Sequence, residues 1–277
     1  MLGKLIKHEF RATGRVLLPL MAAMLLLCAL ANLALRVFAN GIREGWFLQV
    51  VFGLLILLAV LAVMSTAVMA IVIMVSRFYR NLLKDEGYLM FTLPVSVHEL
   101  LWSKLLVSIV WFLATVLLIW LVLFLTFLNL SGTNLGELLS RFPSIREIRI
   151  FLDQYHLLGQ ISTLLLQGLL MVFLSGIAAC LHFYAAMSLG HMFSKDKILL
   201  SIVFFVLLSF VLSMIGTGAS FTLGRHYAVR AEDVEHIREG LSFASVMLWQ
   251  TILFTFLQSV LLYLVTVFGL KKGLNLE

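Results

Sequence analysis

Residues Trp46–Ser76 read WFLQVVFGLLILLAVLAVMSTAVMAIVIMVS, a run of 31 residues without Asp, Glu, Lys or Arg. An α-helix rises about 1.5 Å per residue, so roughly 20 apolar residues cross the hydrocarbon core of a bilayer. Soluble core helices keep a polar face, and this run has none. The stretch therefore predicts a transmembrane helix. At about 46 Å it is long enough to tilt strongly or to project beyond the membrane.

Five further uncharged runs are long enough to cross a bilayer. They are Val16–Leu35, Leu105–Leu128, Leu157–Ala186, Ile198–Thr222 and Phe243–Leu270. The 20 Lys and Arg and the 14 Asp and Glu all fall in the termini and connections. A composition of 12% charged residues is far below the globular norm of about 25%. We expect an all-α polytopic membrane protein, with residues 1–277 forming one transmembrane domain of six spans.

The cations are distributed unevenly between the two sides that six alternating spans define. Residues 1–15, 77–104, 187–197 and the tail from Lys271 carry 12 Lys and Arg against 6 acids. The connections 36–45, 129–156 and 223–242 carry 8 against 8, and every lysine lies on the first side. Basic loops stay in the cytoplasm, so both termini are predicted inside, in a plasma membrane protein. The net charge of +6 is thereby explained without nucleic-acid binding.

The N-terminal residues read MLGKLIKHEFR, with Leu2, Leu5, Ile6 and Phe10 on one helical face. Lys4, Lys7, His8 and Arg11 lie opposite. This pattern favours an interfacial amphipathic helix within residues 1–15, in the inner headgroup layer. A frayed basic tail is the alternative. A secretory signal peptide is disfavoured, because the apolar run continues through Leu35 and five more spans follow.

The connection 77–104 is the largest on the predicted cytoplasmic side. Gly87 is expected to close a helical turn, and Pro94 disfavours helix at Leu93. Ser96-Val97-His98-Glu99 spells a capping box, which predicts a new helix from Val97 into the third span. The loop then presents apolar side chains, Tyr88, Leu89, Met90, Phe91 and Leu93, which need a surface to bury against. That surface is either a cytoplasmic partner or the headgroups and neighbouring helices.

The connections 129–156 and 223–242 are predicted to be extracellular. The first contains a second capping box, Ser144 to Glu147. Helical spacing there relates Ile145, Ile148, Leu152 and Tyr155. A surface-lying helix is expected there. The second includes His226 and His236 among acids, but without the tight spacing of metal ligands. A solvated helix from about Ala231 to Glu239 is expected instead, and no metal site.

Seven polar side chains other than hydroxyls interrupt the spans. They are Asn32, Gln49, Gln160, Gln167, His182, Gln250 and Gln258. Such groups commonly hydrogen-bond between helices. For His182, which lies among small residues, helix packing is the default, and a place along a substrate path is the alternative.

Several kinds of chemistry have no motif in this chain. It contains no G-x-x-x-x-G-K-[ST] phosphate loop and no HExxH, so we expect neither an enzyme, nor catalytic residues, nor a bound cofactor. Apart from His182 the spans carry no acidic or basic side chain. Ion-driven transporters place such groups within the membrane. If the chain moves a substrate, the energy is expected to come from another protein.

Two longer strings and the C-terminal tail resemble a known family. KLIKHEFRATGRVLLPL (Lys4–Leu20), the loop from Lys84 to Lys104 and the tail KKGLNLE look like the six-helix permease subunits of ABC-2-type transporters, especially small permeases of Gram-positive bacteria. The likeness in span count and polarity covers nearly the whole chain. The two strings are moderately specific, whereas the spans are generic. The charged connection between spans five and six departs from the re-entrant apolar helices of polysaccharide and lipid exporters, which argues against a large glycolipid substrate.

The resemblance implies a membrane subunit of an ATP-driven exporter. Two permease copies, or two related permeases, would pair with two separate ATPase subunits that bind ATP and Mg. The loop between spans two and three would form a coupling helix in a groove of the ATPase. Carried onto this chain, the contact comprises Lys84, Asp85, Glu86, Gly87, Tyr88, Leu89, Phe91, Thr92, Leu93 and Pro94. The exported substrate is not implied.

Two other functions remain open. A membrane scaffold or sensor with the same fold would show no ligand-stimulated ATPase activity. An ion-coupled secondary transporter would transport without ATP.

Overall fold

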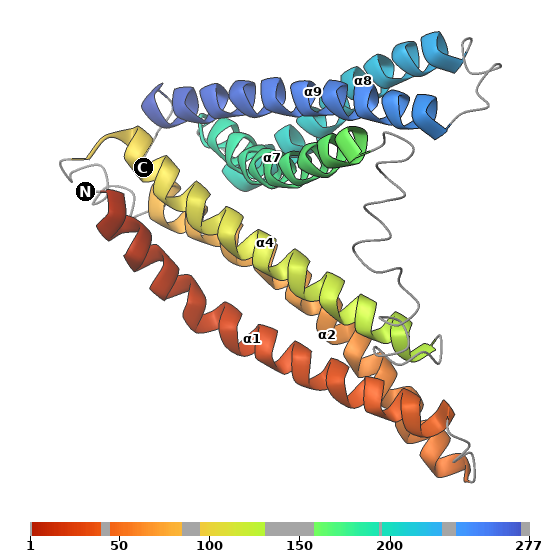
Figure 1. The fold of residues 1–277 in the computed structure, drawn as a ribbon. Coiled ribbons are helices and arrows are strands. Elements are labelled where there is room, and N and C mark those ends of the chain that lie inside the picture. Colours follow the sequence, from red (N-terminus) through yellow and green to blue (C-terminus); the bar gives the residue numbers. More distant parts are fainter. Residues whose placement is uncertain are drawn as a thin grey trace. The chain divides into compact units, whose positions relative to one another are not determined.

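The computed structural model describes residues 2–39, 45–84, 95–130, 158–193, 196–228 and 237–272. These residues form α1 (Leu2–Ala39), α2 (Trp46–Phe78), a π-helical turn η1 (Tyr79–Leu83), α4 (Val97–Leu130), α7 (Leu158–Gly190), α8 (Lys197–Ala228) and α9 (Ile237–Lys272). Six of these described helices are long and apolar enough to cross a membrane, as predicted (Figure 1). The chain is therefore a multi-pass, all-α membrane protein.

The predicted spans coincide closely with the helices. The helix predicted to start at Val97 starts there, and Leu105–Leu128 lies inside α4. The second span continues past Ser76 through Phe78 and then through η1 to Leu83. The predicted extracellular connection 129–156 lies outside the described residues from residue 131 on, including the capping box at Ser144. Of the connection 223–242, residues 223–228 belong to α8 and residues 237–242 to α9, so the helix expected from about Ala231 to Glu239 is described only from Ile237 on.

The N-terminal segment is helical, but it does not form a separate element. Residues 2–39 make one helix, with Pro19 inside it. Lys4, Lys7, His8 and Arg11 are exposed, as expected for the polar face. Ile6 packs against a buried cluster of four residues, Leu17, Met21, Val107 and Trp111. Phe10 stacks on Trp111 of α4, with ring centroids 4.9 Å apart. An interfacial position of residues 1–15 stays a prediction.

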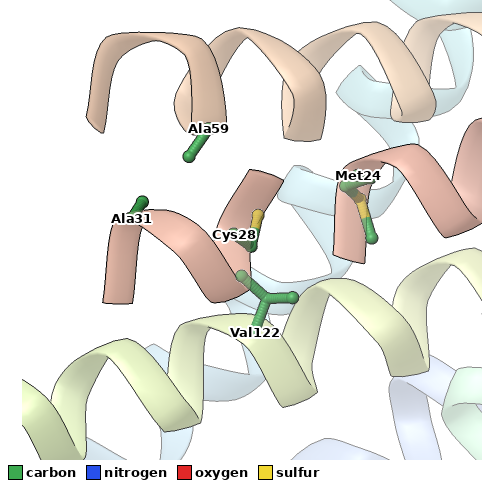
Figure 2. Close-up of a cluster of buried hydrophobic side chains, with 5 residues drawn as sticks. All are labelled: Met24, Cys28, Ala31, Ala59 and Val122. Carbon is green, nitrogen blue, oxygen red and sulfur yellow. The ribbon is translucent and has the colours of Figure 1, made fainter. Parts of the chain in front are cut away.

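The contacts divide the chain into two compact units. The first comprises residues 1–74 and 106–143, and the second residues 75–105 and 144–277. In the first unit α1, α2 and the later part of α4 pack through small side chains (Figure 2). Met24, Cys28 and Ala31 of α1 meet Ala59 of α2 and Val122 of α4. Small residues let the helix backbones approach closely, which is how membrane helices pack without a hydrophobic driving force.

Polar contacts fix the register of α1 against α4 in the first unit. Trp111 Nε1 donates to Thr13 Oγ1 at 2.8 Å. The next residue, Gly14, lies close to the same ring, because a Cβ at Gly14 would be 3.3 Å from Trp111 Cζ2. At the other end of the pair, Asn129 Nδ2 donates to Asn32 Oδ1 at 2.6 Å. Asn32 thus joins two helices, as predicted for a polar side chain in a span.

In the second unit α7 packs against α8 and α9. Gly190 at the end of α7 lies against Ser201 of α8, where a Cβ would come within 2.1 Å of the serine Oγ. Gly269 of α9 lies against Ser188 of α7, where a Cβ would come within 2.8 Å of the serine Cβ. The end of α2, η1 and the first turns of α4 belong to this unit.

Candidate functional site

The predicted ATPase contact begins at the end of η1. Lys84 is exposed and has an extended backbone (φ −111°, ψ −169°), so the helix stops there. Asp85, Glu86, Gly87, Tyr88, Leu89, Phe91, Thr92, Leu93 and Pro94 lie outside the described residues. The structure therefore places the two ends of this loop, at Lys84 and Val95.

The capping box predicted after the loop is present. Glu99 N donates to Ser96 Oγ at 3.2 Å, and Ser96 N donates to Glu99 Oε2 at 3.1 Å. These reciprocal bonds satisfy amide groups that have no carbonyl partner in the first helical turn. The end of the loop is thereby fixed to the start of α4.

The chain that enters the loop is anchored by buried aromatic and aliphatic groups. Phe78 and Leu82 have no solvent exposure. The Phe78 ring stacks on Tyr184 of α7, with centroids 4.0 Å apart and planes 10° from parallel. Burying a large aromatic side chain contributes on the order of 1.5–3 kcal/mol relative to exposure. The turn before Lys84 is thus held against α7.

One residue further, Tyr79 contacts His191 edge-on, with ring centroids 5.3 Å apart. His191 is buried just after α7, and its Nδ1 lies 2.9 Å from the Met187 carbonyl oxygen. Since a carbonyl can only accept, Nδ1 carries the proton. The pKa of His191 is lowered from its ordinary value, mainly by burial. The hydrogen bond to the Met187 carbonyl raises this pKa in part, and the charge of Lys197 lowers it further. Removing the imidazole from water disfavours its charged form.

The chain that leaves the loop is tied to α9. His98 Nδ1 lies 2.6 Å from the Tyr263 hydroxyl, and Lys271 Nζ lies 3.5 Å from His98 Nε2. An ammonium group can only donate, so Nε2 accepts and Nδ1 donates to Tyr263. Behind this contact Leu101 and Leu105 are almost fully buried. Both ends of the loop therefore rest on the helices of the second unit, one on α7 and the other on α9.

Lys104 is buried, whereas a cation of a cytoplasmic loop is expected to be exposed. Its side chain is only 4% exposed, although the sequence places it among the cytoplasmic charges. It lies in α4 between the buried Ser103 and Leu105, so the helix carries it into the packed part of the second unit.

A groove of about 530 Å³ opens among α7, α8 and α9. We call it the α7–α8–α9 groove. Twelve described residues line it, and nine of them have side chains that can hydrogen-bond. The lining residues are His182, Ser209, Leu212, Ser213, Gly216, Thr217, Ser220, Gln250, Thr251, Phe254, Thr255 and Gln258. All belong to the second unit.

Sequence periodicity explains why the groove is polar. Ser209, Ser213, Gly216 and Ser220 follow at intervals of four, three and four residues, which places them on one face of α8. Gly216 leaves room for the Phe254 ring, whose Cε1 would lie 3.0 Å from a Cβ at that position. His182, Gln250 and Gln258 were predicted as polar residues of the spans, whereas this serine stripe was not predicted, although its spacing is visible in the sequence.

His182 is bound to α8 at the edge of the groove. Its Nε2 lies 2.9 Å from Ser209 Oγ and 3.3 Å from the Phe205 carbonyl oxygen. Ser209 donates its one hydroxyl proton to the Phe205 carbonyl oxygen at 2.8 Å. Nε2 therefore carries a proton and donates to both. His182 joins α7 to α8, the packing role predicted, and it also lines the groove.

Three glutamine side chains keep a buried acceptor without a donor among the described residues. These are the Oε1 atoms of Gln160, Gln167 and Gln250. An unpaired buried acceptor costs about 1–3 kcal/mol. Gln167 also joins two helices, because its Nε2 donates to Ser245 Oγ of α9 at 2.8 Å. Of the three, only Gln250 lines the groove.

Within the described ranges, no three His, Cys, Asp or Glu side chains come together as metal ligands would. The fold and the six apolar helices define a multi-pass integral membrane protein. The chain matches no protein-family model, no curated protein and no solved structure with which it was compared.

Proposed function

We propose that this chain is the permease subunit of an ATP-binding-cassette exporter, driven by a separate ATPase that docks on the loop from Lys84 to Pro94. The observation that carries the proposal is the anchoring of that loop at both ends. Its entry is fixed to α7 through Phe78 and Tyr184, and its exit is fixed to α9 through His98 and Tyr263. A loop held in this way can transmit a push from a bound protein into two transmembrane helices.

Two further features support the same function. The six spans predicted from the sequence lack acidic and basic side chains apart from His182, although α4 also carries the buried Lys104. The chain therefore has little of the machinery of ion-coupled transport. The loop also concentrates apolar residues on the side that the lysine distribution assigns to the cytoplasm, where an ATPase would be found. Coupling is then mechanical, because the chain contributes no covalent chemistry.

The test compares two triple variants for association with an ATPase that co-purifies with the unmodified chain. The loop variant carries Leu89→Ala, Phe91→Ala and Leu93→Ala. The control carries Ile145→Ala, Ile148→Ala and Leu152→Ala in the predicted extracellular connection. We expect the loop variant to insert into the membrane normally and to lose the ATPase, and the control to retain it. Equal ATPase recovery with both variants contradicts the assignment of the loop.

A further inference from the structure

Several oxygens that line the α7–α8–α9 groove are available only as hydrogen-bond acceptors. Ser209, Thr251 and Thr255 each donate their single hydroxyl proton to a carbonyl of their own helix, at 2.8 Å in every case. Their oxygens can then only accept from a ligand. Gln250 adds a carbonyl oxygen that has no donor among the described residues. Ser209 Oγ already accepts from His182 Nε2, so the acceptors left for a ligand are the oxygens of Thr251, Thr255 and Gln250.

Among the described residues that line the groove there is no Lys, Arg, Asp or Glu. An anion entering the groove would have no cationic side chain among these lining residues to pair with, and an unpaired buried charge is strongly disfavoured. A cation would meet the oxygens of Thr251, Thr255 and Gln250, which can accept from its N–H groups. A ligand bearing N–H groups matches the surplus acceptors, and the Phe254 ring offers an apolar wall to the rest of the molecule. The groove volume lies within the range of about 300–1,000 Å³ that small-molecule sites occupy.

We propose that the α7–α8–α9 groove is a hydrated binding site for the transported molecule, which it holds through amine or amide N–H donors. The site takes neutral or cationic molecules and rejects anions. This inference names a substrate class for the permease proposed above and rests on that function. Its test requires no ATPase, however, so the two proposals fail separately.

The first measurement asks whether the groove is hydrated. Ser213→Cys places a thiol in the groove, and Ile215→Cys places one on another face of α8, two residues away; both positions are exposed. The native Cys28 and Cys180 are buried, so the unmodified chain gives the background. Open membrane fragments are treated with a cationic trimethylammonium methanethiosulfonate and, separately, with an anionic sulfonate methanethiosulfonate. Each rate is divided by the rate of the same reagent with 2-mercaptoethanol.

We expect the cationic reagent to modify Ser213→Cys at least about tenfold faster than Ile215→Cys, because a thiol facing lipid is not ionised and is not reached by charged reagents. At Ser213→Cys the normalised cationic rate should exceed the anionic rate. Equal rates at the two positions would mean that lipid or a second copy of the chain fills the groove. Equal rates for the two reagents would remove the charge selectivity. Either result overturns the proposal.

The second measurement asks what the groove holds. Butylammonium, N-methylbutanamide and butyrate are each tested for slowing the modification of Ser213→Cys. We expect protection by butylammonium, by N-methylbutanamide or by both, which distinguishes an amine from an amide ligand. Protection by butyrate, or by none of the three, contradicts the proposal.

Gln250→Leu removes the acceptor that lacks a donor, and it should reduce the protection at least about tenfold if that oxygen receives the ligand's hydrogen bond. The matched control is Gln160→Leu, which removes a similar buried acceptor outside the groove. Both variants should fold, since each replaces an unpaired polar atom by an apolar group. Unchanged protection in Gln250→Leu, or equal loss in both variants, rejects the role of Gln250.

Discussion

Phe78 at the end of α2 and Tyr184 in α7 stack face to face, and neither side chain has any solvent exposure. Phe78 is followed directly by η1 and then by Lys84, where the helix ends. The stack is thus the contact through which the entry to the loop is fixed to the transmembrane helices.

Replacing Phe78 by Ala should destabilise the fold by about 3–5 kcal/mol, because it removes a fully buried ring and leaves a cavity beside Tyr184. Phe210→Ala is the control, since Phe210 is 65% exposed. The stabilities of both variants are measured by unfolding the protein in mild detergent with heat or with a denaturant. A loss for Phe78→Ala no larger than that for Phe210→Ala would show that the stack does not hold the loop entry.

The contact between Gly269 and Ser188 predicts a second effect. A Cβ at Gly269 would approach the Ser188 Cβ to 2.8 Å, so Gly269→Ala must separate α9 from α7. The expected loss of stability is about 1–3 kcal/mol, the usual cost of overpacking. Gly168→Ala is the control on α7, where a Cβ meets nothing within 4 Å. Equal stability of the two variants would contradict this close approach of the helices.

The capping box gives a third prediction. Ser96→Ala removes the acceptor for Glu99 N, and it should cost about 0.5–2 kcal/mol at the start of α4. Hydrogen exchange should accelerate in the amides of residues 97–100 and remain unchanged in the middle of α4. Ser108→Ala, within the same helix, serves as the comparison. Exchange that stays slow at residues 97–100 would mean that the box does not hold the first turn.

His191 predicts a dependence of stability on pH. Its folded-state pKa is lowered from the ordinary 6.5, mainly by burial. Below about pH 6.5 the unfolded chain therefore binds more protons than the folded chain, and stability falls as the pH falls. His191→Asn, which keeps a donor near the Met187 carbonyl, should reduce the difference in stability between pH 7 and pH 5. An identical difference in the variant would exclude His191 as its source.

The sequence predicts the helices well because a bilayer imposes a simple requirement on them. Uncharged length alone locates the six spans, and the Ser96–Glu99 box locates the start of α4 at Val97, since both signals are local. The predicted interfacial segment has no boundary of its own, because no proline lies between Ala12 and Arg15 to interrupt a helix. Residues 2–39 accordingly form one helix in the structure.

The pairing of side chains could not be read in the same way. Phe78 and Tyr184 are separated by more than a hundred residues, and generic apolar spans do not encode which faces meet. His191 and Tyr263 were not identified as contacts of the loop ends for the same reason. The serine stripe of α8 is different, because its spacing is visible in the sequence and only its facing partner on α9 required the structure.

The proposed exporter depends on a partner protein that supplies the energy. The direct measurement is gentle purification of the tagged chain from its native membrane, with identification of every protein that accompanies it. We predict recovery of a protein that contains a phosphate loop and hydrolyses ATP, in a roughly equal amount, as the paired subunits of such transporters require. Recovery of the chain without any such protein, together with uphill transport by the chain reconstituted alone, would contradict the account.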